Sequence, residues 1–153
     1  MPSFSHSRET VIAAQATTIH ALISDFHEWT KWSPWESLDP ALQRSYDGEG
    51  VGATYHWKGN SKAGEGTMTF TAISASQIDV DLSFLKPFKA ENEVSFELVP
   101  VEGGTRVTWT MGGNRNPVFA LMGRLFLDKA IGKDFDKGLA SLKAVAERED
   151  QQG

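Results

Sequence analysis

Apolar and polar residues alternate along most of the middle of the chain. Between residues 42 and 111, six short segments place apolar residues at every second position, with polar residues between them. A period of two is typical of antiparallel strands that bury one face and expose the other to solvent. Glycine-containing turns at 47–50 and 103–104 separate neighbouring segments at hairpin length. With a further strand at 7–14, the pattern predicts an antiparallel sheet of about seven strands.

Helical spacing appears directly after the first predicted strand. Four apolar residues recur at this spacing and predict a short helix: Ile19, Leu22, Ile23 and Phe26. Thr17 or Thr18 is the expected cap of this helix. Trp29 and Trp32 are three positions apart and predict a second short helix, which ends before Pro34. We expect both tryptophans to anchor the short helices to the sheet.

The longest helical run covers residues 117–149. If each residue turns the helix by about 100°, the apolar faces of its two halves are out of phase by roughly a third of a turn. We therefore expect a break or kink near residues 127–132, with Asp128 as a second cap. Residues 147–153 are charged and are expected to form a frayed tail.

Composition and charge exclude several classes of function. The chain has 153 residues, of which 40% are hydrophobic and 23% charged, and this suits one globular domain over residues 1–153. A formal net charge of −5 argues against a nucleic-acid partner, because such partners require a basic surface. No apolar run approaches the roughly 20 residues that a membrane-spanning helix needs. There is no signal-peptide core and no cysteine, so we expect a cytoplasmic protein.

Two sequence patterns that could suggest cofactor or metal binding do not fit their surroundings in the chain. Residues 48–53 satisfy the dinucleotide fingerprint G-x-G-x-x-A, but they lead into a predicted strand where the fingerprint requires a helix. They therefore predict a hairpin turn. The histidines lack the spacing of zinc ligands, and the chain has no thiolate. We expect no metal and no cofactor at any of them: His6, His20, His27 and His56.

No catalytic signature is present either. The G-x-S-x-G motif of nucleophilic hydrolases is absent, and His56 alternates with Tyr55 and Trp57, which predicts that it faces solvent. A β-bulge could turn a carboxylate toward the apolar face. Carboxylates are, however, found more often at solvated strand ends and turns. The four candidates are Glu36, Asp47, Glu65 and Glu93. We assign no catalytic residue, and whether the protein is an enzyme stays open.

One face of the predicted sheet carries many large, soft or flat side chains. They are Trp57, Met68, Phe70, Phe84, Phe96, Trp109 and Met111. Such a face suits an apolar ligand pocket, but a core between a sheet and a helix needs the same residues. Trp35, in the loop after the short helices, is a candidate either for the pocket mouth or for the core. The first half of the long helix supplies a candidate wall near the mouth: Phe119, Met122 and Phe126.

Several short motifs follow one another in an order that is characteristic of one superfamily. They are Trp32-Ser33-Pro34-Trp35, Tyr46-Asp47-Gly48, Trp57-Lys58-Gly59-Asn60, Gly64-Glu65-Gly66, Thr105-Arg106-Val107-Thr108-Trp109, Ile131-Gly132-Lys133-Asp134-Phe135 and Gly138-Leu139-Ala140-Ser141-Leu142-Lys143. Over roughly residues 7 to 148, the chain resembles the START-like (SRPBCC) superfamily, which includes the birch-pollen allergen type. More narrowly, it is similar to the polyketide cyclase/dehydrase branch.

The resemblance implies an α+β helix-grip fold. In this fold a curved antiparallel sheet of about seven strands wraps around the long C-terminal helix, and two short helices follow the first strand. The resemblance also implies a cavity between the sheet and the C-terminal helix. The large apolar side chains on one sheet face agree with such a cavity.

The function expected from these features is binding of a small, largely apolar molecule, such as a lipid, a polyketide or another aromatic compound. An alternative is a polyketide cyclase or dehydratase that uses the same cavity, because this chemistry needs a shaped site and one or two acid–base groups. A further alternative is an interaction or regulatory module with a vestigial cavity. A homodimer is compatible with all three.

Overall fold

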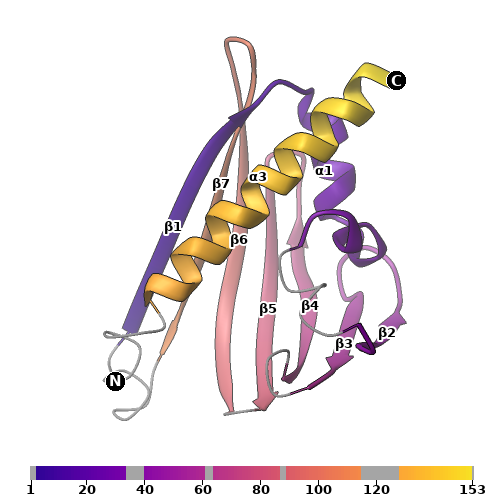
Figure 1. Cartoon of the computed structure of the whole chain (residues 1–153), viewed down its shortest axis with the longest axis vertical. Coiled ribbons are helices and arrows are strands. Elements are labelled where there is room, and N and C mark those ends of the chain that lie inside the picture. The colour runs from indigo at the N-terminus through magenta and orange to yellow at the C-terminus, as the bar shows by residue number, and fades with distance from the viewer. Residues whose placement is uncertain (1–2, 34–39, 61–63, 87–88, 115–127, 153) are drawn as a thin grey trace.

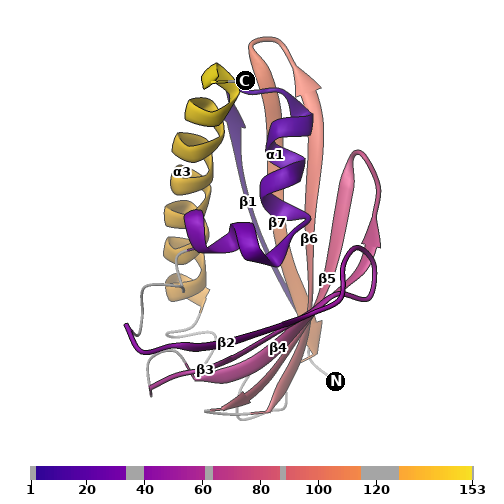
Figure 2. The same cartoon turned by 90° about the vertical axis from the view of Figure 1, so that its right-hand side faces the viewer.

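The computed structural model describes residues 3–33, 40–60, 64–86, 89–114 and 128–152. In chain order the elements are β1 (Ser3–Ile12), α1 (Ala16–Ile23), η1 (Phe26–Lys31), β2 (Gln43–Asp47), β3 (Thr54–Lys58), β4 (Glu65–Ile73), β5 (Gln77–Lys86), β6 (Ala90–Val101), β7 (Gly104–Asn114) and α3 (Asp128–Gln152). The seven strands form one antiparallel sheet in the order β1-β7-β6-β5-β4-β3-β2. Figure 1 shows α3 lying diagonally across one face of this sheet, and Figure 2 shows the sheet curving so that β2, β3 and β4 run beneath η1. The predicted α+β helix-grip fold is confirmed.

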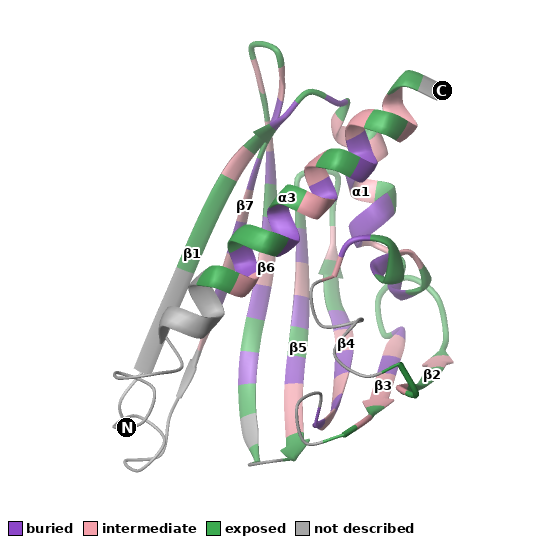
Figure 3. Cartoon of the chain, viewed as in Figure 1, coloured by how far each residue is buried: buried purple, intermediate pink, exposed green. Residues whose placement is uncertain are grey.

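Period-two patterning places one face of the sheet against the helices. Along β4, the buried residues Gly66, Met68 and Phe70 alternate with the half-buried Thr67 and Thr69. Because consecutive side chains of a strand point to opposite faces, the buried sets of neighbouring strands combine into one inner face. Figure 3 shows the same alternation of buried and more exposed residues along β5 and β6.

An apolar stripe of α3 packs against the inner face. Its buried residues recur at helical spacing: Phe135, Leu139, Leu142, Val145 and Ala146. Phe135 stacks on Trp109 of β7, with ring centroids 4.2 Å apart and an interplanar angle of 9°. The described part of α3 starts at Asp128, and the predicted cap at this residue stays a prediction, because the residues before it lie outside the described ones. The predicted first half of the long helix, at 117–126, lies outside the described residues.

The end of α3 caps the start of α1, which corrects the predicted cap. The N-cap residue of α1 is Gln15, and its side chain makes no capping hydrogen bond. Instead, Asp150 of α3 accepts hydrogen bonds from the backbone N–H of Gln15 at 3.1 Å and from the Thr18 hydroxyl at 2.9 Å. A carboxylate at this point satisfies an unpaired helix N–H and interacts favourably with the positive end of the helix dipole. The prediction that Thr17 or Thr18 caps this helix is therefore wrong.

Glu147 also connects α3 to the turn between β1 and α1. Its carboxylate pairs with Lys143, one turn earlier, and accepts a hydrogen bond from the backbone N–H of Ala13 at 2.9 Å. The hydrogen bond from Lys143 and then that from Ala13 lower the pKa of Glu147 below its usual value. α3 continues to Gln152, so the region expected to be a frayed tail contributes contacts between α3 and the turn that joins β1 to α1.

Trp29 and Trp32 anchor the short helices, as predicted. Both side chains are buried, and the indole Nε1 atoms donate to the carbonyl oxygens of Ile23 at 2.8 Å and Leu22 at 2.9 Å. Both rings meet Phe96 of β6 edge-on, with ring centroids 5.8 and 5.9 Å away. These contacts fix η1 both to α1 and to the sheet.

Candidate functional site

Cross-strand pairing arranges the inner side chains in rows, and the central row is completely buried. Ile78, Phe96 and Trp109 are directly opposite one another on β5, β6 and β7 and are 0%, 0% and 1% exposed. The rings of Phe96 and Trp109 stack with centroids 5.0 Å apart, and Trp109 stacks in turn on Phe135 of α3. This part of the inner face is hydrophobic core.

Burial decreases along the strands from this row toward the end of the sheet where β4 and β6 begin. One row further along, Val94 and Met111 are 5% and 6% exposed, whereas Phe70 and Val80 in the same row are each 1% exposed. In the next row, Tyr55, Met68, Leu82 and Asn92 are opposite one another and are 3%, 8%, 6% and 7% exposed. The helices therefore cover the inner face less completely at this end.

The last row at this end is formed by Trp57, Gly66 and Phe84 of β3, β4 and β5. Trp57 and Phe84 are half-buried, and their rings meet edge-on with centroids 5.8 Å apart. The indole lies over Gly66, where an added Cβ atom would be 2.6 Å from Trp57 Cζ2. We use the name inner strip for the seven incompletely covered residues Trp57, Met68, Leu82, Phe84, Asn92, Val94 and Met111.

The predicted lining residues divide between the inner strip and the core. Four of them belong to the inner strip: Trp57, Met68, Phe84 and Met111. Three are at most 1% exposed and pack in the core: Phe70, Phe96 and Trp109. The other four lie outside the described residues: Trp35, Phe119, Met122 and Phe126.

Asn92 is the polar member of the inner strip and is absent from the predicted lining. The apolar pattern of β6 does not include it, because its side chain is polar. Its phase nevertheless identifies it, since it precedes Val94 and Phe96 at a spacing of two and therefore faces the same side. Within the described residues, Asn92 and Thr105 are the buried side chains that are neither apolar nor aromatic, and neither of them ionises. Thr105 lies elsewhere and donates its hydroxyl to the Ala14 carbonyl at 2.9 Å.

The candidate acid–base residues do not gather at the inner strip. His56 faces the outer side of the sheet, as predicted, with Nε2 3.2 Å from Glu65 and Nδ1 3.0 Å from the Thr67 hydroxyl. Asp47 and Glu93 are exposed, and Glu36 lies outside the described residues. The candidates that the structure describes therefore agree with solvated strand residues, and none of them supplies a proton donor or acceptor to the inner strip.

The side chain of Arg44 brings a positive charge to the rim of the inner strip. Arg44 is opposite Trp57 in the register of β2 and β3, so both side chains leave the sheet on the same side. β2 is the last strand of the sheet, and Arg44 is exposed there. A molecule in contact with Trp57 would therefore meet a positive charge at its solvent-facing end.

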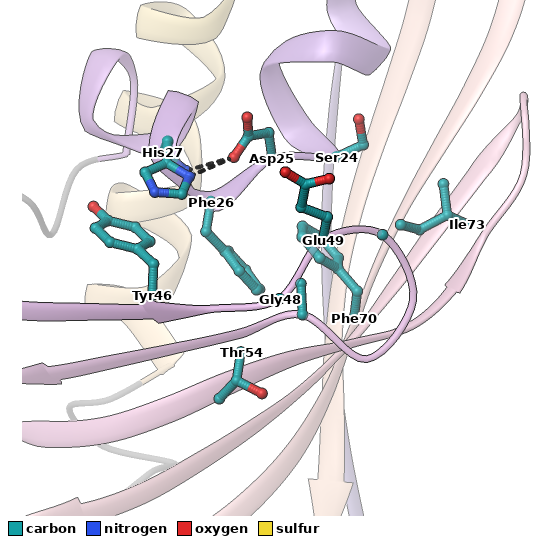
Figure 4. Close-up of a pocket in the computed structure, with 12 residues that line it drawn as sticks. Ser24, Asp25, Phe26, His27, Tyr46, Gly48, Glu49, Thr54, Phe70 and Ile73 are labelled. Atoms are coloured by element: carbon teal, nitrogen blue, oxygen red, sulfur yellow. Dashed lines mark hydrogen bonds and ion pairs between the residues drawn. The ribbon is translucent and has the colours of Figure 1, made fainter.

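A separate groove opens between the α1–η1 junction and the turn that joins β2 to β3 (Figure 4). Its volume is about 530 Å³. Phe26 and Phe70 line it and stack on each other with centroids 4.0 Å apart. Glu49 projects from the turn toward Ser24 and Asp25 on the opposite side. The groove combines an apolar wall with carboxylates on two sides.

Asp25 and His27 form a pair at the rim of this groove. Asp25 caps η1 by accepting the backbone N–H of His27 at 2.9 Å, and the same oxygen lies 2.9 Å from His27 Nδ1. The imidazole stacks on Tyr46 of β2, with ring centroids 4.0 Å apart. The cap fixes the carboxylate and the carboxylate orients the ring, which leaves Nε2 as the nitrogen able to meet a molecule in the groove.

No metal ligand set is assigned. The described parts of the chain contain no group of three or more His, Asp or Glu side chains that could hold a metal ion. Of the helices in these parts, none is long and apolar enough to cross a membrane.

The curved sheet, the helix that it grips and the apolar strip between them define a helix-grip protein of the START-like superfamily. The chain belongs to the family described as polyketide cyclase/dehydrase and lipid transport, whose model matches residues 1–147. No curated protein matches the chain at a significant level.

Solved structures with very different sequences share the fold. One is the di-domain ARO/CYC protein StfQ from the steffimycin biosynthetic pathway, with a TM-score of 0.75 and 10% identity over 96% of this chain and 51% of that chain. The Aha1 dimer from Colwellia psychrerythraea gives a TM-score of 0.67 and 20% identity over 96% and 97% of the two chains. A protein of unknown function from Staphylococcus aureus gives 0.74 and 10% over 98% and 97%. At these identities, the similarity shows the fold alone.

Proposed function

We propose that the protein binds a small, largely apolar molecule between the sheet and α3, against the inner strip. The observation that carries the proposal is the decrease in burial along the inner face. Exposure rises from 0–1% in the central row to 5–8% in five residues of the strip, and the other two, Trp57 and Phe84, are half-buried. Apolar and aromatic linings with few polar groups are typical of small-molecule sites. The family description, which combines cyclases with lipid transport, agrees with an apolar ligand.

Binding would be driven by removal of apolar surface from water. Each 100 Å² of ligand surface buried against the strip contributes about 2.5 kcal/mol before the entropy cost of association. Trp57 and Phe84 present the largest flat surfaces of the strip, and Met68 and Met111 can adapt their shape to the ligand. The strip therefore favours molecules with rings over unbranched chains of the same size.

Native mass spectrometry and tryptophan fluorescence test the proposal together. The protein as purified is examined for co-purified molecules and is then titrated with 2-acetylnaphthalene, 1-anilinonaphthalene-8-sulfonate and palmitate. We expect saturable binding of a ring-containing ligand and a change in tryptophan emission. In a Trp35→Phe background, Trp57→Phe should remove most of that change, because the remaining tryptophans, Trp29, Trp32 and Trp109, are at most 2% exposed in the core.

Val51→Ala is the matched control, since Val51 is an apolar side chain that is 61% exposed on the β2–β3 turn. It should leave binding unchanged. Absence of any bound or titratable apolar molecule would refute the proposal and favour an interaction module with a vestigial cavity.

Acid–base catalysis of the cyclase or dehydratase kind is the second candidate function. The observation that favours it is the oriented Asp25–His27 pair beside a groove of about 530 Å³. A histidine held by a carboxylate is a common general base. If the groove is a catalytic site, His27→Gln should abolish turnover of a linear polyketone analogue, and Phe84→Leu in the inner strip should not. Unchanged turnover in the His27 variant would exclude this role.

A homodimer and a cytoplasmic location complete the proposal. The comparison with the Aha1 dimer supports testing for self-association, and the edge strand β2 (Gln43–Asp47), at one end of the sheet, supplies backbone groups for strand pairing. Light scattering coupled to gel filtration should give twice the monomer mass of 16.8 kDa. A monomer mass at all concentrations would rule out the dimer.

A further inference from the structure

We propose that Asn92 is the specificity-determining residue of the inner strip and that it selects a neutral ligand with a carbonyl or hydroxyl group on a ring-containing apolar body. The inference rests on the proposed binding at this strip and adds the chemistry of the ligand. It follows from where the side chain lies, what surrounds it and which hydrogen bonds it makes.

Register fixes the direction of the Asn92 side chain. On β6, Asn92 is opposite Leu82 of β5 and Gly113 of β7, and it is two residues before Val94. Leu82 and Val94 both face inward and are buried, so the amide projects to the inner face as well. Its neighbours within one row are apolar, including Phe84 and Met111.

The burial of Asn92 is exceptional for a polar side chain in such surroundings. Only 7% of the residue is exposed. None of the hydrogen bonds found among the described residues involves its side chain, and it is not among the residues with further polar contacts. Buried amides are nearly always hydrogen-bonded. The amide atoms of Asn92 are not among the fully buried side-chain atoms that lack a partner in the described residues, so they keep some access to solvent or to a ligand. The residual exposure leaves room for a partner that is not part of the chain.

The chemistry of the amide defines the partner. Asn offers two N–H donors and one carbonyl acceptor, so it can donate to a ligand carbonyl or exchange a hydrogen bond with a ligand hydroxyl. A charged ligand group at this depth is disfavoured, because the buried polar side chains of the described residues, Asn92 and Thr105, carry no charge to compensate it. Arg44 is exposed at the rim and would meet only the solvent-facing end of the molecule. A neutral oxygen at the inner end of an apolar molecule satisfies these conditions.

Two probes of the same shape test the inference: 2-acetylnaphthalene, which has a ketone oxygen, and 2-ethylnaphthalene, which has none. Both are titrated into the wild type and into Asn92→Leu, which replaces the amide by an apolar group of similar size. We expect the wild type to prefer the ketone and the variant to lose that preference, so that the ratio of the two Kd values changes by about 5- to 30-fold. Binding of 2-ethylnaphthalene should change by less than about twofold.

Glu93→Gln is the matched control, since Glu93 is the next residue on β6 and is exposed on the outer face. It should leave both Kd values unchanged. Thermal unfolding provides an independent readout of Asn92→Leu. If the Asn92 side chain has no partner in the chain, the variant should melt at least as high as the wild type. A melting temperature lowered by more than about 4 °C would reveal a structural hydrogen bond and overturn the inference. Asn92→Ala repeats the titration should the leucine variant fail to fold.

The outcomes separate the two proposals. If neither naphthalene binds to the wild type, both proposals fail. If both bind and the ratio of their Kd values is the same in the wild type and in the Asn92 variants, the inner strip binds ligands but Asn92 does not select them. If the ratio is unchanged and an ordered water is found on the amide, Asn92 serves only to hold that water, which also overturns the inference.

Discussion

Replacing Gly66 by alanine tests whether the indole of Trp57 lies flat on the sheet. Gly66 has no positive φ, so alanine is compatible with its backbone conformation. In an unobstructed strand, the change from glycine to alanine is stabilising by about 0.5–1 kcal/mol, because it reduces the entropy of the unfolded chain. Here the added Cβ would lie 2.6 Å from Trp57 Cζ2 and 2.7 Å from the Ser83 carbonyl oxygen, closer than such atoms approach.

The expected net effect is destabilisation. Overpacking of a closely packed site costs about 1–3 kcal/mol. After subtraction of the gain from the backbone, Gly66→Ala should lower the free energy of unfolding by about 0.5–2 kcal/mol. For a chain of this length the melting temperature should fall by about 1–8 °C. Thermal unfolding followed by circular dichroism measures the shift.

Measuring Gly66→Ala in a Trp57→Leu background separates the contact with the indole from the contact with the Ser83 carbonyl. In Trp57→Leu the ring is removed but the Ser83 carbonyl remains, so Gly66→Ala should cost less there than in the wild type. Equal costs in the two backgrounds would assign the strain to the Ser83 carbonyl alone. A Gly66→Ala variant that is more stable than the wild type would refute the placement of Trp57 over Gly66.

Two further predictions concern the corner where α3 meets α1. Lys143 and the Ala13 N–H lower the pKa of Glu147, so its contribution to stability is present above the unfolded pKa of about 4.5 and is lost as the pH falls through the lower folded value. Urea unfolding of the wild type and Glu147→Gln at pH 7 and below pH 4 should give a difference in stability that shrinks in acid, and a constant difference would contradict this. Asp150→Ala removes the cap of α1 and should cost about 1 kcal/mol. Hydrogen exchange should then speed up selectively at the amides of Gln15 and its helix, and a uniform or absent change would argue against the cap.

The sheet and the gripping helix follow from local patterns. Alternation at β3 to β7 and helical spacing in α3 each require only the side chains of one segment, so the sequence predicts them directly. The outward direction of His56 follows from the same alternation and is confirmed. The cap of α1 does not follow from local sequence, because Asp150 is 135 residues away from Gln15.

The candidate site can be predicted only in part, because it also depends on contacts between segments that are far apart in the sequence. The sequence places Trp57, Met68 and Phe96 on one face, but it does not say which of them the helices cover. The coverage of each residue depends on where η1 and α3 cross the strands. In the structure Phe96 lies in the core, whereas Met68 lies at the edge of the region that the helices cover. The groove at His27 combines the α1–η1 junction with a turn some twenty residues later, so no single segment predicts it.

Methyl NMR can show directly whether a ligand binds at the inner strip, because the chain has four methionines and two of them, Met68 and Met111, lie in this strip. Protein labelled at the methionine and isoleucine methyl groups is titrated with 2-acetylnaphthalene, and Met68→Leu and Met111→Leu assign the resonances. A ligand bound at the inner strip should give saturable ring-current shifts at Met68 and Met111 and leave the signal of Ile73, which lines the separate groove, unchanged. Shifts at Ile73 with both methionine signals unmoved would place the ligand in the groove and refute binding at the inner strip.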